Sequence, residues 1–166
     1  MLNKVFSFPH PVNEVAARLV AGMVALLTLS IVLLDLYQLC FLLTYGFLAR
    51  VFTGPTLSPA GLLATRVLIP ALGNPTKLVP RPPKRFAQAI GLSVSSTATL
   101  LIFGFGLEFW GEVLLLLLIG FATAESIFGF CFGCYLFGHL MNLGLIPEDV
   151  CERCANWQLG QLQEQD

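Results

Sequence analysis

Long apolar runs, separated by short polar or proline-rich stretches, organise this chain. The runs cover residues 15–34, 36–53, 86–106 and 111–134. Because a lipid bilayer offers the backbone no hydrogen-bond partner, a run of about 20 apolar residues forms a helix that crosses it. The pattern therefore predicts an all-α polytopic membrane bundle of four transmembrane helices within residues 1–145. A polar tail follows over residues 146–166.

Asp35 separates the first two runs and leaves two interpretations open. The sequence has neither glycine nor proline near this position, which favours one continuous helix over both runs. Such a helix would be roughly 57 Å long, against a hydrocarbon thickness of about 30 Å. Bilayer thickness thus favours a hairpin that turns near Asp35, and we expect the hairpin.

Prolines recur throughout residues 53–85, too often for a spanning helix. The middle of this segment, residues 60–71, is apolar, carries Arg66 and is too short to cross a bilayer. It predicts an amphipathic helix in the membrane interface. Four basic residues just before the third run are expected to face anionic lipid headgroups. They are Lys77, Arg81, Lys84 and Arg85.

Positive charge is distributed unevenly over the loops. Residues 50–85 contain six Lys and Arg, whereas the turns near Asp35 and Glu108 contain none. The positive-inside rule places the long segment, and with it both termini, in the cytoplasm. On this topology the fourth run begins outside and reaches the cytoplasmic surface close to Cys131.

Composition supports the membrane class and excludes others. Hydrophobic residues make up 56% of the chain and charged residues only 11%, compared with roughly 25% charged in globular proteins. The net charge of −1 and the lack of a basic patch with interleaved aromatics argue against nucleic-acid binding. The first 14 residues lack the features of a cleaved signal peptide, so we expect the chain to be inserted unprocessed.

Four of the five cysteines form two CxxC pairs. Cys131 and Cys134 stand at the end of the fourth run, and Cys151 and Cys154 stand in the tail. The spacing brings two sulfurs close enough for a disulfide or a shared metal. In cytosol-facing proteins such pairs are usually catalytic or metal-binding. Cys40 is expected to be a packing residue.

Catalytic use of the first pair requires a lowered thiol pKa, which a helix N-terminus or a nearby cation provides. A continuous fourth helix supplies no N-terminus at that point. Gly129 and Gly133 flank the pair and could break the helix there, although their spacing is also typical of close helix packing.

Two functions remain open for the four thiols. In the first, Cys131, Cys134, Cys151 and Cys154 exchange electrons or sulfur in a membrane thiol-redox or sulfur-relay protein. In the second, the same residues hold a structural zinc ion in a non-enzymatic protein, because C-x2-C-x16-C-x2-C matches four-thiolate zinc spacing. A scaffold or assembly component that packs through its glycines, with possible homo-oligomers, is a third interpretation.

Two further residues are candidates. Glu125 is an acid inside the fourth run, and such acids mark a function or a polar partner. Arg18 and the hydroxyl-rich residues 93–97 are candidate partners, and on a regular helix Glu125 does not share a face with Cys131. His139 is a candidate base or extra metal ligand.

The motifs Pro83-Lys-Arg-Phe-Ala-Gln-Ala-Ile-Gly91 and Gly129-Phe-Cys-Phe-Gly-Cys134 resemble a family of small bacterial multi-pass membrane proteins, known only as a domain of unknown function. Gly54-Pro55 with Ser58-Pro59 and the Val12-Asn-Glu entry look similar too. The resemblance covers about residues 9–140 and is most specific at GFCxGC. It implies a four-span fold in the bacterial inner membrane, a role for Cys131 and Cys134, and a thioredoxin-like or rhodanese-like cytosolic partner.

The tail pair lies beyond that shared region. A rival resemblance is to quinone-linked disulfide-forming membrane enzymes, which also combine four helices with a membrane CxxC. Their second cysteine pair precedes the membrane pair and lies outside, whereas Cys151 and Cys154 follow it and are expected inside. This departure argues against disulfide formation outside the cell.

Overall fold

The computed structural model describes residues 12–79 and 81–143. Its helices are α2 (Glu14–Leu33), α3 (Leu39–Thr53), α4 (Pro59–Leu63), a π-helical turn η1 (Ala64–Leu68), α5 (Ile69–Ala71), α6 (Arg81–Gly104), α7 (Glu108–Phe128) and α8 (Phe132–Asn142). The two-residue strands β1 (Val12–Asn13) and β2 (Leu78–Val79) pair antiparallel. Over the described ranges the fold is thus helical, as the sequence predicts. The tail with Cys151 and Cys154 lies outside the described residues.

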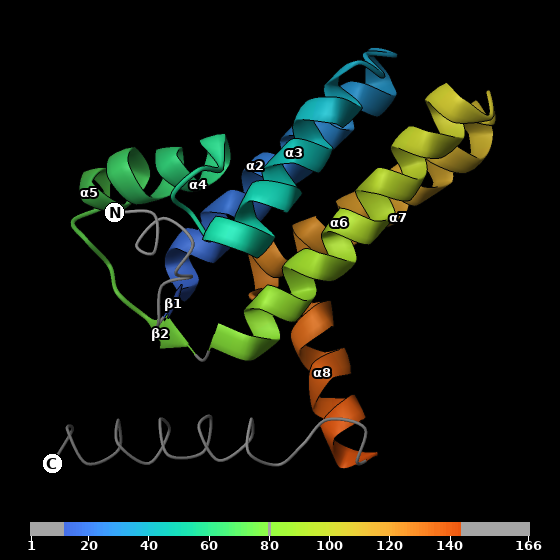
Figure 1. Ribbon diagram of the computed structural model, residues 1–166. Coiled ribbons are helices and arrows are strands. Elements are labelled where there is room, and N and C mark those ends of the chain that lie inside the picture. Colours follow the sequence, from blue (N-terminus) through green and yellow to red (C-terminus); the bar gives the residue numbers. More distant parts are fainter. Residues whose placement is uncertain (1–11, 80, 144–166) are drawn as a thin grey trace, which may run out of the picture.

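Two helical hairpins form the body of the protein (Figure 1). Helices α2 and α3 form one hairpin and α6 and α7 the other, and both tips lie at the same end of the molecule. The first hairpin turns at Asp35, whose φ of 53° lies in the left-handed region that aspartate tolerates. The second turns at Gly106, with φ 65°. The hairpin expected near Asp35 is confirmed.

The hairpins pack on each other through α2 against α7 and α3 against α6. Their shared core consists of buried apolar side chains from all four helices, including Ile31, Leu43, Phe47, Ile102 and Leu115. Close approach depends on small residues, at Gly91 between the hairpins and at Gly111 within the second hairpin. A Cβ at Gly91 would collide with the Phe47 ring, and one at Gly111 with Ile102.

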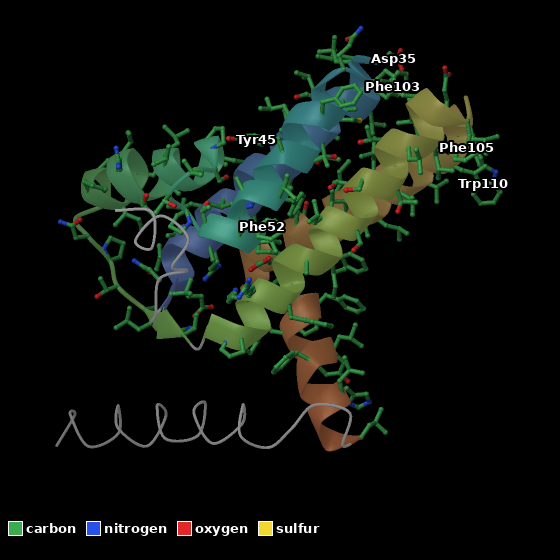
Figure 2. All side chains as sticks on the ribbon, in the orientation of Figure 1. Asp35, Tyr45, Phe52, Phe103, Phe105 and Trp110 are labelled. Atoms are coloured by element: carbon green, nitrogen blue, oxygen red, sulfur yellow. The ribbon has the colours of Figure 1, made fainter. Side chains whose placement is uncertain are left out.

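Three helical segments are long and apolar enough to cross a membrane: Glu14–Leu33, Pro82–Gly104 and Glu108–Phe128. Many large apolar side chains face outward, with Tyr45 and Phe52 on α3 and Phe103, Phe105 and Trp110 near the tip of the second hairpin (Figure 2). Apolar exposure of this extent is unusual for a protein surrounded by water. Together these features indicate a membrane protein.

Two expected spans differ from the observed helices. Helix α3 has 15 residues and is shorter than the expected run 36–53. Residues 111–134 are not one helix, because α7 ends at Phe128 and α8 starts anew at Phe132. Between the hairpins, the expected short helix 60–71 corresponds to the continuous helical segment Pro59–Ala71.

Candidate functional site

The helical structure is interrupted between α7 and α8, at the first cysteine pair. Gly129 ends α7 in the left-handed conformation, with φ 69° and ψ 10°. Its N–H donates to the carbonyl of Glu125 at 3.1 Å, and the N–H of Phe130 donates to that of Ala124 at 3.3 Å. Glycine adopts this helix-terminating conformation without steric cost. The break, which the sequence left open, turns α8 away from the axis of α7 (Figure 1).

Cys131 occupies the position just before α8. The N–H of Tyr135 donates to the Cys131 carbonyl at 3.0 Å, which is the first helical hydrogen bond of α8. Cys131 is therefore the residue at the helix entrance, where free N–H groups and the helix dipole favour a negative charge. Cys131 is buried, Cys134 is half-buried, and both are free thiols.

The pKa values of the two thiols are shifted in opposite directions. A hydrogen bond with the Cys134 side chain lowers the pKa of Cys131, and the backbone N–H of Cys134 and the Lys84 ammonium lower it further, whereas burial and Glu125 oppose the shift. The same hydrogen bond, together with burial, raises the pKa of Cys134. Cys131 is thus the thiol that ionises first, and Cys134 keeps its proton.

Lys84 reaches this pair from the first turns of α6. Its Nζ lies 2.7 Å from Oε1 of Glu125, and the two side chains are only 8% and 15% exposed. Both charges lie close enough to Cys131 and Cys134 to affect their ionisation. A buried cation held by a carboxylate therefore faces the dithiol.

Arg50 completes the polar cluster from the C-terminal end of α3. It is 5% exposed, and its Cζ lies 4.4 Å from the centroid of the Phe47 ring. Its Nε and Nη2 have no hydrogen-bond partner among the described residues, and neither has Oε1 of Gln88. Polar groups left unpaired in the interior are rare in folded proteins.

Cavities adjoin the cluster at Arg50. One of about 70 Å³ is lined by Arg50, Gln88, Glu125 and Cys131 among other residues. A second, of about 240 Å³, shares Arg50 and Gln88 with the first and adds Lys84. The cluster is therefore adjoined by free volume large enough for small molecules.

The expected surroundings of Glu125 need correction. Arg18 is not its partner, because Arg18 Nε and Nη2 donate to the carbonyls of Ser126 at 3.1 Å and Ile127 at 2.6 Å at the end of α7. The hydroxyls within residues 93–97 that form hydrogen bonds donate to carbonyls of α6 itself. The argument that Glu125 and Cys131 face apart assumed a regular helix, and the break at Gly129 removes that assumption.

The remaining residues that the sequence singled out lie in different places. His139 lies on α8 five residues beyond Cys134, about 140° away around the helix, and its exposed ring stacks on Tyr135 at 5.6 Å. Lys84, expected at the headgroups, is instead buried against Glu125. Cys151 and Cys154 lie outside the described residues, so the four-cysteine zinc site stays a prediction. Within residues 12–79 and 81–143, no three His, Cys, Asp or Glu gather into a metal site.

The pKa difference between the thiols predicts how fast Cys131 is alkylated as pH rises. The thiolate is the reactive form, so a lowered pKa moves the midpoint of the rate to lower pH. In Cys134→Ala the donor of the strongest lowering contact is lost, and the midpoint should move upward. Iodoacetamide labelling of Cys131 across a pH series measures it. Cys134→Ser, which keeps a donor, should retain part of the shift, and equal midpoints in all three proteins would refute the assignment.

Gly133 allows the start of α8 to pack against α6. A Cβ there would lie 2.5 Å from both Cα and Cβ of Ala87, and neither atom can move alone. Gly133→Ala should therefore push α8 off α6 and lower the free energy of unfolding by about 1–3 kcal/mol. Thermal denaturation in detergent micelles measures the loss. Gly138→Ala is the matched control, since a Cβ there meets nothing within 4 Å; an equal loss in both variants would contradict the packing argument.

Comparison with known proteins assigns the chain to a family. The model of a family described as "Domain of unknown function (DUF4395)" matches residues 12–142, and the chain belongs to that family. Neither the curated proteins nor the solved structures contain a match. The matched region includes the break at Gly129 and the whole polar cluster.

Proposed function

We propose that this member of the DUF4395 family is an integral membrane thiol-redox or sulfur-relay protein in which Cys131 is the reactive thiol. The supporting observation is the position of Cys131 at the entrance of α8, hydrogen-bonded with Cys134 and facing the Lys84 ammonium. Each of these features favours a thiolate at Cys131. A packing cysteine would need none of them.

The chemistry is thiol–disulfide exchange. The Cys131 thiolate attacks one sulfur of an incoming disulfide, forms a mixed disulfide and releases the other sulfur as a thiolate. Cys134 then loses its proton and attacks the Cys131 sulfur, which frees the second thiolate. The protein ends with a Cys131–Cys134 disulfide, and two electrons have passed to the substrate.

Lys84 and Glu125 support this cycle without touching the transferred sulfur. The ammonium favours the thiolate before attack, and the carboxylate fixes the ammonium through the 2.7 Å contact. When Cys134 gives up its proton in the second step, the same ammonium favours that thiolate as well. The pair therefore acts as an electrostatic support for both sulfurs in turn.

Cys151 and Cys154 serve in this proposal as the second dithiol of the relay. They would exchange with Cys131 and Cys134 through further mixed disulfides and receive electrons or sulfur from a thioredoxin-like or rhodanese-like cytosolic protein. In the persulfide version, the Cys131 thiolate attacks the outer sulfur of a persulfide on the donor protein. The S–S bond of the donor breaks, the donor leaves as a thiolate, and Cys131 carries the transferred sulfur as a persulfide.

The membrane arrangement that we propose has four crossings in the bacterial inner membrane and both termini in the cytoplasm. Helix α3 is about 22 Å long and returns from the hairpin tip, which supports a short fourth crossing. Segment Pro59–Ala71 would lie in the interface. Basic residues at the end opposite the tips support the orientation, since positive charge favours the cytoplasmic side.

Trapping tests the function. In Cys134→Ser made in a Cys151→Ser/Cys154→Ser background, neither Cys134 nor a tail thiol can resolve the adduct, so exchange should stop at a mixed disulfide on Cys131 that is stable to isolation without reductant. Mass spectrometry of protein purified from bacterial membranes identifies the adduct. Cys131→Ser should trap no adduct at Cys134, and Cys40→Ser should behave like wild type. Equal trapping in the two CxxC variants would refute a directional dithiol.

Labelling tests the topology. A membrane-impermeant maleimide should modify Cys131 in inverted inner-membrane vesicles and not in right-side-out vesicles. A chain with Cys131 as its single cysteine makes the assignment unique. Modification from the outer side only would overturn the proposed orientation.

A further inference from the structure

Arg50 is the buried charge that the thiol chemistry leaves unexplained. It is 5% exposed and lies on α3, at the end of the bundle where α6 begins and α7 ends. The neighbouring cations and acid do not balance. Arg50 and Lys84 carry two positive charges and Glu125 one negative charge, so one positive charge is in surplus while both thiols are protonated.

The unpaired atoms of Arg50 specify what would balance it. Nε and Nη2 lie on one edge of the planar guanidinium and point in parallel, and neither has a partner among the described residues. This edge matches two oxygens of one oxyanion or carboxylate. The Glu125 carboxylate attracts Arg50 electrostatically, but its hydrogen bond goes to Lys84.

The space around Arg50 sets the size of the partner. The cavity that Arg50 shares with Cys131 measures about 70 Å³, room for a group of a few non-hydrogen atoms. The cavity shared with Lys84 measures about 240 Å³, and a third of about 270 Å³ reaches Arg50 from the side of α4. Nε and Nη2 have no water-accessible surface, so a ligand reaches them only when the side chain turns toward one of these cavities, all of which Arg50 lines.

We propose that Arg50 and Lys84, with the amide of Gln88, bind a small inorganic oxyanion in the cavity next to Cys131. The unpaired guanidinium edge provides a bidentate contact, and Lys84, which lines the adjoining cavity of about 240 Å³, provides a second positive charge nearby. The NH2 group of Gln88 can donate a hydrogen bond to the anion, whereas its unpaired oxygen is an acceptor and does not face it. The site goes beyond the proposed thiol exchange, since anion binding requires neither thiol to react.

Binding is tested with sulfate on the full-length protein in detergent micelles, with chloride at equal ionic strength as reference. Sulfate should raise the Tm more than chloride does, because it binds only the folded state. Sulfate also stabilises folded proteins generally, because it is excluded from their surface. Arg50→Met should therefore reduce the difference to this general effect, whereas Arg66→Met should keep all of it, since Arg66 is exposed on η1. Arg50→Lys keeps the positive charge and loses the bidentate guanidinium edge, so it should bind sulfate at least roughly tenfold more weakly than wild type. An equal difference between sulfate and chloride in wild type and in Arg50→Met would overturn the site.

Arg50→Met is expected to fold as stably as the wild-type protein. Without anion, Arg50→Met removes an unpaired buried charge, so its Tm should equal or exceed that of wild type. A large loss of Tm in chloride would show that Arg50 is a structural cation and would overturn the proposal.

A second readout locates the anion. Sulfate should slow iodoacetamide labelling of Cys131 in wild type and not in Arg50→Met, because the bound anion would occupy the cavity that Cys131 lines. Binding without this protection would overturn the placement. In Cys131→Ser/Cys134→Ser the sulfate-dependent Tm shift should persist, so failure of thiol exchange and failure of anion binding are told apart.

Discussion

Cys131→Ser should slow thiol–disulfide exchange with 2-hydroxyethyl disulfide by roughly one to two orders of magnitude. The variant loses the thiol whose pKa is lowered by Cys134 and Lys84, and it leaves Cys134, whose pKa is raised. Only a small fraction of Cys134 is thiolate near neutral pH, so little nucleophile remains. The rate is measured by mass spectrometry in a Cys151→Ser/Cys154→Ser background, which removes the tail thiols from the count.

The control for this experiment is Cys40→Ser. Cys40 is buried in the core between the hairpins, and its removal should leave the exchange rate within a factor of about two, since core packing does not set thiolate content. If Cys131→Ser and Cys134→Ser lowered the rate of mixed-disulfide formation equally, the two thiols would be equivalent and the assignment of Cys131 as nucleophile would fail.

Lys84→Met should lower the free energy of unfolding by about 3 kcal/mol. The substitution leaves the Glu125 carboxylate, which is 15% exposed, without the ammonium that lies 2.7 Å from it. This value is the lower end of the usual cost of breaking a buried ion pair, because Arg50 still attracts the carboxylate. Denaturation in mixed micelles measures the change.

Two further variants test whether the cost arises from the burial of the Lys84–Glu125 ion pair. Lys77→Met breaks the 2.9 Å contact with Glu14, in which the lysine is 70% exposed, and should cost less than about 1 kcal/mol. Lys84→Met/Glu125→Leu removes both buried charges and should recover most of the loss, since neither remains unpaired. Equal losses in Lys84→Met and Lys77→Met would show that Lys84 and Glu125 are not effectively buried.

The sequence predicted the fold well where a long-range physical limit applied. Bilayer thickness required a turn between residues 15 and 53, and the chain turns at Asp35 although no glycine or proline marks the place. Frequent prolines excluded a spanning helix between the hairpins, and the short apolar stretch 60–71 predicted the helical segment that the structure has at Pro59–Ala71. The end of α7 was harder, because Gly129 and Gly133 have the spacing of a packing motif. Gly129 in fact ends the helix, and only Gly133 packs closely, against Ala87.

The site was only half predictable for a similar reason. Cys131 and Cys134 are recognisable by spacing alone, and Glu125 by its apolar surroundings. Lys84 belongs to a basic run that is typical of a headgroup-facing segment, and its burial depends on α7 bringing Glu125 to meet it. Arg50 shares one face of α3 with buried Leu43 and Phe47, a signal at helical spacing that was available in the sequence.

The central claim is that Cys131 and Cys134 form a redox-active dithiol. Its most direct test is a redox titration of the purified protein in buffers with defined ratios of reduced to oxidised dithiothreitol. Cys131 and Cys134 should convert together between two free thiols and one disulfide, reversibly, with alkylation followed by mass spectrometry and with Cys40 reduced throughout. Thiols that stay protected across the series, with about one zinc ion per chain that is lost in Cys151→Ser, would contradict it and favour a structural four-cysteine site.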